Sequence, residues 1–204
     1  VPLSLLGPAV SAAAHLRPRI HKAFAEAWPH RAAAKPRIPD VATRLVKAPF
    51  DVWRTKDVAA FVDALPLDAT VPPVDGMPGG TPAARARLRA FLRKRLRGYA
   101  EERSEPCAPA EGHASGLSPY LHFGHVSIEE VVEAALATTG KWSPDELRLH
   151  NRGKREGFFC DDPDVNSFLD EALTWRDVGF QWHWSRRADA AGLETALPAW
   201  ALQT

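Results

Sequence analysis

The sequence predicts a mainly α protein, and three features of the chain support this fold class. Apolar residues recur at helical spacing in several segments, helix start signals precede those segments, and strand signals are scarce. The chain has 204 residues, of which 45% are hydrophobic and 25% charged, and this is enough for one core with or without an appended segment. We therefore expect a soluble helical protein.

The first 75 residues have the composition of connecting structure. Prolines interrupt this stretch repeatedly and limit any helix in it to short pieces. Two pieces carry helical patterns, at residues 12–28 and 52–65, and the second can begin at Thr55 or Asp57. We expect a boundary near residue 75, followed by a helical domain over residues 76–204.

The first strong helix signal lies after Gly79. Thr81 is a candidate N-cap, and Pro82 suits the first helical position because its missing N–H is not needed there. The apolar residues that follow fall on one stripe: Ala84, Leu88, Phe91, Leu92, Leu96 and Tyr99. Basic residues cover the rest of this predicted helix: Arg85, Arg87, Arg89, Arg93, Lys94, Arg95 and Arg97. Such a surface suits DNA phosphates, but it also suits a solvated face that pairs with the acids at Glu101, Glu102 and Glu105.

Later segments repeat the helical signals. Ser127 and Glu130 form a capping box for a helix that we expect to end at Gly140, and Ser143 provides another start signal. The last strong helix begins near Asp164. It leads into an aromatic cluster that we expect to pack in the core, namely Phe180, Trp182 and Trp184. Leu197–Leu202 begins a further helix that the sequence does not cap.

Composition argues against several classes of protein. Cys107 and Cys160 have no metal-ligand spacing, so we expect reduced thiols and a cytoplasmic protein. No apolar run approaches the roughly 20 residues of a membrane span, and the start has no signal-peptide pattern. His122 and His125 lack a third ligand, so we expect no metal site. We also expect a monomer.

The segment SGLSPYLHFG, which begins at Ser115, has the chemistry of a phosphate-binding turn. Ser115 and Gly116 are small enough for the backbone to approach a bulky anion, and Ser118 supplies a hydroxyl. Pro119 can begin a helix whose free N–H groups point at that anion. On the residues alone, a serine before a proline is more often a plain helix cap.

The segment FLDEALTWRD places a carboxylate and an indole close together. Glu171 and Trp175 are four residues apart, so on a helix their side chains are neighbours. The acid can hydrogen-bond to a pyrimidine, and the flat ring can pack against a flipped-out dinucleotide that has lost its stacking. Taken singly, a solvated glutamate and a core tryptophan explain these residues as well.

These motifs, in this order and together with the preceding helix TPAARARLRAFLRKRLRGY and with LHFGHVS, resemble the DNA photolyase and cryptochrome family, and its class II branch fits best. The resemblance covers residues 81–204 well and the first 75 residues loosely. It implies the family's helical FAD-binding domain, incomplete at the C-terminus. We accordingly expect a fragment that follows a missing antenna domain and lacks the later segment for the flavin ring.

The resemblance also implies an activity and its residues. The activity is the light-driven repair of cyclobutane pyrimidine dimers in DNA by electron transfer from reduced FAD, and damaged DNA is the partner. The residues implied to contact the diphosphate and ribityl part of FAD are Tyr99, Ser115, Gly116, Leu117 and Ser118. Those implied to bind the dimer and the DNA are Glu171, Trp175 and Arg176, the first two with catalytic roles. Ala114 stands where many relatives carry a hydroxyl.

Two other functions stay open at this point. One is a cryptochrome-like blue-light flavoprotein without repair activity, although a sensor has no need of a dimer-binding acid such as Glu171. The other is a helical DNA-binding or interaction module that holds no flavin.

Overall fold

The computed structural model describes residues 1–31, 57–68, 70–72, 74–107, 112–149, 153–186, 192 and 197–203, and this part of the chain contains helices and no strand. The prediction of a mainly α protein is therefore confirmed. The chain forms two compact units, one of residues 1–32 with 79–204 and one of residues 33–78. Residues 1–32, which we expected to belong to a connecting segment, thus pack with the later helical part. Their assignment to an interdomain segment of the family remains a prediction.

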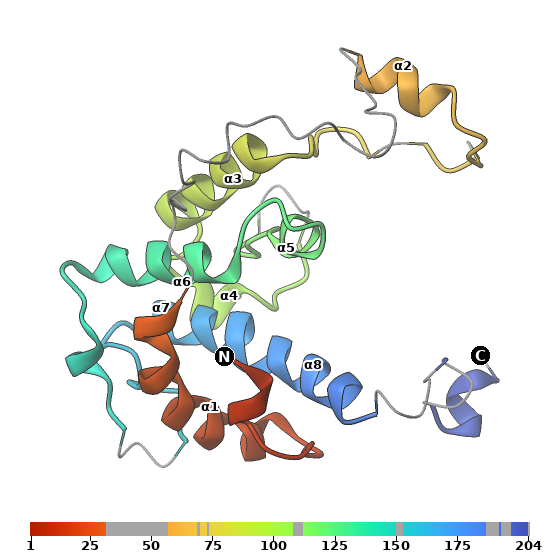
Figure 1. Ribbon diagram of the computed structural model, residues 1–204. Helices are drawn as coiled ribbons and strands as arrows, with labels where there is room; N and C mark the ends of the chain where they lie inside the picture. The colour runs from red at the N-terminus through yellow and green to blue at the C-terminus, as the bar shows by residue number, and fades with distance from the viewer. Residues whose placement is uncertain are drawn as a thin grey trace, which may run out of the picture. The chain divides into compact units, whose positions relative to one another are not determined.

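The helices follow one another in short pieces (Figure 1). The α-helices are α1 (Ala13–Ala27), α2 (Val58–Asp63), α3 (Thr81–Lys94), α4 (Tyr99–Glu102), α5 (Ser118–His122), α6 (Ile128–Leu136), α7 (Pro163–Leu169) and α8 (Arg176–Ser185). A π-helix, η6 (Asp170–Trp175), joins α7 to α8. The 3₁₀ turns are η1 (Leu3–Leu5), η2 (Trp28–His30), η4 (Ala137–Thr139), η5 (Pro144–Glu146) and η8 (Ala199–Leu202).

The predicted long basic helix is divided in two. Thr81 is its first helical residue rather than its cap, and α3 ends at Lys94. Gly98 adopts φ +87°, the left-handed conformation that glycine reaches without steric cost, and Tyr99 then begins α4. The apolar stripe continues across this break, because Leu96 and Tyr99 are both buried. Helical spacing alone therefore could not locate the end of α3.

Asp164 fixes the position of α4. Its carboxylate accepts the backbone N–H of Gly98 at 2.9 Å and that of Ala100 at 2.8 Å. These N–H groups lie at the start of α4, where a helix has no internal acceptors for them. Asp164 itself lies in the first turn of α7, so the contact joins α4 to α7.

Two helix starts agree with the sequence prediction. Ser127 Oγ accepts the N–H of Glu130 at 3.1 Å, so Ser127 caps α6 as expected. Gly140 ends the following 3₁₀ turn at φ +106°. At Ser143 both hydrogen bonds of a capping box form, but they begin only the short turn η5.

Three interlocking aromatic rings form the centre of the larger core. The ring centroids of Phe91 and Phe168 are 4.7 Å apart, and the Tyr99 ring lies 5.6 Å from Phe91 and 5.5 Å from Phe168. The two pairs that Tyr99 makes are edge-to-face, and such pairs add about 0.5–1.5 kcal/mol each to the stabilisation that burial provides. The three rings join α3, α4 and α7.

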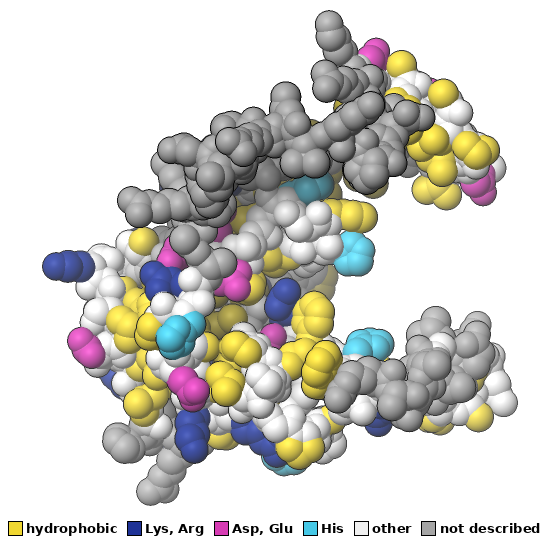
Figure 2. All heavy atoms as spheres, in the orientation of Figure 1, with side chains coloured by type: hydrophobic (Ala, Val, Ile, Leu, Met, Phe, Trp, Pro, Cys, Tyr) yellow, Lys and Arg dark blue, Asp and Glu magenta, His cyan; other side chains and the backbone are white. Residues whose placement is uncertain are grey.

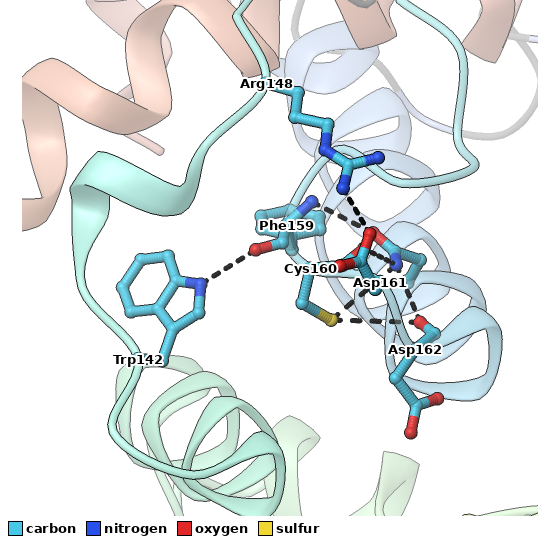
Figure 3. Close-up of polar contacts among 7 residues, drawn as sticks. Trp142, Arg148, Phe159, Cys160, Asp161 and Asp162 are labelled. Atoms are coloured by element: carbon cyan, nitrogen blue, oxygen red, sulfur yellow. Dashed lines mark hydrogen bonds and ion pairs between the residues drawn. The ribbon is translucent and has the colours of Figure 1, made fainter.

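The start of α7 is held by a buried amide. Asn166 Nδ2 donates to the carbonyls of Cys160 at 2.7 Å and Asp162 at 2.6 Å, and its Oδ1 accepts the N–H of Phe159 at 2.9 Å. Figure 3 shows how the indole of Trp142 donates to the Phe159 carbonyl, at 2.8 Å, from the other side of the same loop. The loop that leads into α7 is therefore fixed on both sides.

The aromatic cluster of α8 is mostly exposed, so our expectation that it packs in the core is wrong. Phe180 is 50% and Trp184 49% exposed, and the residue of this segment that is fully covered is Gln181. The Gln181 amide donates to the carbonyls of Leu6, Gly7 and Pro8. A polar contact with the N-terminal segment thus determines which side of α8 is buried, and helical periodicity does not reveal this contact.

Candidate functional site

The candidate site lies on η6, a widened helical segment. Figure 1 shows α7, η6 and α8 as one continuous rod, and α1 packs against η6. π-Helical turns are rare and are frequent at functional sites. Both predicted dimer-binding residues, Glu171 and Trp175, lie within this segment.

Adjacent carboxylates on η6 face different surroundings. Asp170 is buried and accepts two hydrogen bonds from Arg17 of α1, at 2.7 Å from Nε and 3.0 Å from Nη2. This bidentate pair holds the π-helix against α1. Glu171 keeps 29% of its side chain exposed, and Trp175 is 53% exposed. The acid and the indole are therefore both accessible to a ligand.

Arg103 connects Glu171 to Tyr99. Its Nη1 lies 3.0 Å from Glu171 Oε1, and its guanidinium carbon lies 5.9 Å from the centre of the Tyr99 ring. Its Nε is buried without a hydrogen-bond partner among the residues that the structure describes. Sequence reasoning missed Arg103, although its place four residues after Tyr99 is a usable signal.

The pKa values of the two connected residues are both raised. Burial raises the pKa of the Glu171 carboxyl, and Asp170 raises it further, while the positive charge of Arg103 lowers it. Burial also raises the pKa of the Tyr99 hydroxyl, and the Glu171 charge adds to this effect. A carboxyl with a raised pKa takes up a proton more readily than an exposed glutamate does.

The predicted phosphate-binding turn, Ser115–Ser118, is built from local contacts and one arginine. Gly116 has φ +65°, and the N–H of Leu117 donates to Ser115 Oγ at 3.3 Å. The Leu117 side chain is only 1% exposed and belongs to the core that contains Tyr99. Arg87 Nε donates to the Ser115 carbonyl at 2.8 Å, which ties the turn to α3.

His113 anchors the segment before this turn. One ring nitrogen, Nδ1, lies 2.9 Å from the Arg95 carbonyl, and the other, Nε2, lies 3.1 Å from Glu102 Oε2. Each ring nitrogen thus faces an oxygen acceptor. The turn is consequently held from α3 and from α4.

The structure brings together only some of the predicted site residues. Tyr99 and Glu171 are linked through Arg103, and Leu117 shares their core. The Arg176 guanidinium lies 4.5 Å from the centre of the Phe180 ring, and its Nη1 lies 3.7 Å from Asp177 Oδ1. The roles of these residues toward FAD and DNA remain predictions.

Arg176 lines a cavity of about 610 Å³ that contains no residue of the turn and neither Glu171 nor Trp175. Apolar side chains from three regions line this cavity, including Phe24, Leu121 and Val132. Two smaller cavities of about 530 and 470 Å³ do not include the predicted residues either. Glu171 and Trp175 of the candidate site are partly exposed, whereas Tyr99 and Leu117 are buried. Figure 2 shows hydrophobic side chains interspersed with charged ones over the helical unit.

The basic surface of α3 is partly used by internal contacts. Arg85 forms a bidentate pair with Glu130 of α6, at 2.6 and 3.0 Å, and Arg87 holds the turn. Arg85 therefore pairs with α6 rather than with the acids that follow α3. Other basic residues of this surface are exposed: Arg89, Arg93, Lys94 and Arg97.

Within the described ranges, no group of three or more His, Cys, Asp or Glu side chains is arranged to hold a metal ion. His125 Nδ1 instead accepts the N–H of Gly80 at 3.1 Å. No helix in the part of the chain that the structure describes has the length and apolar character needed to cross a membrane.

Comparison with known proteins finds similarity over short stretches. The chain is 44% identical over 63 residues to the deoxyribodipyrimidine photo-lyase of Oryza sativa subsp. japonica, which is 29% of this chain and 12% of the rice protein. It is 54% identical over 39 residues to the deoxyribodipyrimidine photo-lyase of Arabidopsis thaliana, which is 19% of this chain and 8% of that protein. No family model matches the chain. Over part of its length, the chain is therefore similar to plant photo-lyases.

Proposed function

We propose that this chain is part of a class II-like DNA photolyase, an FAD enzyme that repairs cyclobutane pyrimidine dimers under light. The sequence motifs and the partial similarity to plant photo-lyases support a photolyase-related function. Repair is an activity of the whole protein. This chain contributes parts of the cofactor site and of the substrate site.

The observation that carries the proposal is the placement of Glu171 and Trp175 on the π-helix. Both side chains are accessible, and Arg103 links Glu171 to the buried ring of Tyr99. A flipped dimer offers two carbonyl-rich bases that have lost their stacking. Trp175 would pack against these bases, and Glu171 would hydrogen-bond to them and stabilise negative charge that develops during ring opening.

The turn at Ser115–Ser118 suits the diphosphate of FAD. Gly116 leaves the backbone without a side chain at this point, and Arg87 adds a positive charge beside it. When bound, reduced FAD supplies the electron that opens the cyclobutane ring after light is absorbed. The residues that would hold its diphosphate and ribityl part are Tyr99, Ser115, Gly116, Leu117 and Ser118.

Binding to damaged DNA tests the substrate half of the proposal. Fluorescence anisotropy compares a labelled duplex that carries one pyrimidine dimer with the same duplex undamaged. The dimer should bind more tightly, and Trp175→Ala should remove about 1–3 kcal/mol of that preference, the usual value of a base–aromatic stack. Trp200, which is 73% exposed on η8, provides the matched control, because Trp200→Ala should leave the preference unchanged. Equal binding of both duplexes by the unmodified chain would remove the substrate role.

A second function, a helical DNA-binding module without flavin, is favoured by the exposed basic residues of α3. Arg89, Arg93, Lys94 and Arg97 can contact phosphates without reading damage. This function predicts binding that depends steeply on salt and ignores the dimer. The two duplexes in the anisotropy experiment distinguish it from repair.

A further inference from the structure

We propose that Arg87 of α3 is a positioning residue for the Ser115–Ser118 turn, and that a side chain at residue 116 would displace the Arg87 guanidinium from this turn. The expected effect on cofactor binding rests on the proposed function. The structural interlock between Arg87 and Gly116 does not.

The geometry joins the two residues closely. Arg87 Nε donates to the Ser115 carbonyl at 2.8 Å. A Cβ atom added to Gly116 would lie 2.7 Å from Arg87 Nε and 2.8 Å from its Cζ, with Nη2 closer still. Cβ atoms do not approach other atoms to such distances, so a side chain at residue 116 would displace the guanidinium from its hydrogen bond.

The backbone gives a second, separable reason for glycine. Gly116 has φ +65°, a conformation that residues with a side chain rarely adopt. Any substitution of Gly116 should therefore destabilise the turn in two ways, through the backbone conformation and through the displacement of Arg87. Removal of Arg87 should eliminate the second effect and leave the first.

The charge of Arg87 is available at the turn. Arg85, two residues earlier in α3, is neutralised by Glu130, whereas no ion pair of Arg87 is found among the described residues. The Arg87 guanidinium nitrogens other than Nε likewise have no hydrogen bond within that part of the chain. A fixed cation with free N–H groups beside a small-residue turn favours a phosphate or diphosphate group as ligand.

Amide hydrogen exchange tests the positioning role without a ligand. In Arg87→Ala, amides of the turn and of the following residues up to Leu121 should exchange about tenfold faster, the effect of one lost hydrogen bond. Arg87→Lys should restore part of the protection, because its ammonium can still donate to the Ser115 carbonyl. Arg89→Ala, an exposed substitution on the same helix, is the control and should change nothing. Unchanged exchange in Arg87→Ala would overturn the inference.

A double-mutant comparison tests the steric interlock. Gly116→Ala should accelerate exchange at the turn more in the unmodified chain than in Arg87→Ala, because only the unmodified chain has a guanidinium to displace. The same acceleration in both backgrounds would show that the glycine is needed for its backbone alone and would contradict the proposal.

Ligand titrations separate this inference from the proposed function. For the unmodified chain we expect binding of FAD and ADP, and Arg87→Ala should weaken both, while the affinity for riboflavin, which has no phosphate, should stay the same. Binding of FAD that Arg87→Ala leaves unaltered would refute the contribution of Arg87 to ligand binding. A flat FAD titration of the unmodified chain would count against the proposed cofactor role, and hydrogen exchange would still decide the role of Arg87.

Discussion

Arg103 is the residue whose contacts say most about the candidate site, because it lies between Glu171 and Tyr99. Its positive charge opposes the effect of burial on the Glu171 carboxyl. For the Tyr99 hydroxyl, the Glu171 charge raises the pKa and the Arg103 charge lowers it. A residue that no motif contains thus moderates the rise that burial causes in the pKa of the proposed dimer-binding acid.

We predict that Arg103→Ala raises the pKa of Glu171 above its value in the unmodified chain. The reason is that the nearest positive charge disappears while the burial of the carboxyl and the neighbouring Asp170 remain. An NMR titration of the glutamate side-chain carbons measures the change directly. Arg155→Ala, which removes a weaker influence on the same carboxyl, should produce a smaller rise. A larger rise in Arg155→Ala than in Arg103→Ala would show that the ion pair is not the main control.

His21 provides a prediction about stability and pH. It is buried against Phe158, with ring centroids 3.5 Å apart, and burial lowers its pKa to about 4. An unfolded histidine has a pKa near 6.5, so between pH 6.5 and 4 the unfolded chain binds the additional proton and folding becomes less favourable as the pH falls.

Urea unfolding at pH 8 and pH 5 measures this effect. The unmodified chain should lose up to about 2 kcal/mol through His21 over this interval. His21→Gln should lose less on acidification, whereas His15→Gln, an exposed substitution on the same helix, should behave as the unmodified chain. The idea fails if His21→Gln retains the full dependence on pH.

At the scale of the helices, short pieces are held in place by side-chain caps. α4 has four residues and cannot be stable by itself, since isolated helices of this length do not form in water. Asp164 supplies acceptors for two of its N–H groups. Because Tyr99 is the first residue of α4, this cap also fixes a predicted cofactor contact.

Asp164→Ala should therefore lower the free energy of unfolding by about 1–3 kcal/mol, the combined cost of a lost cap and of two unpaired N–H groups. Urea denaturation gives this value. Asp161, which is exposed and pairs with Arg148, is the comparison, and Asp161→Ala should cost under about 1 kcal/mol. Equal losses in the two variants would mean that Asp164 does not hold α4.

The π-helix is the other element that decides the site. It places Asp170 toward Arg17 of α1 and leaves Glu171 and Trp175 accessible, so one segment has a buried anchor and an exposed pair. Spacing in the sequence correctly put Glu171 and Trp175 on one helical segment. It could not reveal the π geometry, because that depends on contacts with α1, more than a hundred residues away in the chain.

For the molecule as a whole, the sequence predicted the elements whose signals are local. The caps at Ser127 and Ser143 and the helix near Asp164 depend on residues within one turn, and the structure has them. The burial of Gln181 instead of the aromatic residues of α8 depends on the N-terminal segment, which periodicity does not include.

The candidate site divides in the same way. Glu171, Trp175 and the turn were found from motifs, because each motif is continuous in sequence. The sequence assigned Arg87 and Arg103 no role at the site, because their partners are distant in the chain. Ser115, the partner of Arg87, is 28 residues away, and Glu171, the partner of Arg103, is farther still. Long-range polar contacts of this kind become visible only when the helices are placed in space.

The most direct measurement is an NMR map, on the isotope-labelled chain, of the residues that contact FAD and dimer-containing DNA. FAD should shift the signals of the Ser115–Ser118 amides and of the Tyr99 ring, and a short dimer-containing DNA added afterwards should shift the Trp175 indole and the amides of η6. FAD shifts confined to the 610 Å³ cavity at Phe24 and Val132, with η6 unaffected by the DNA, would contradict a photolyase site built from these residues.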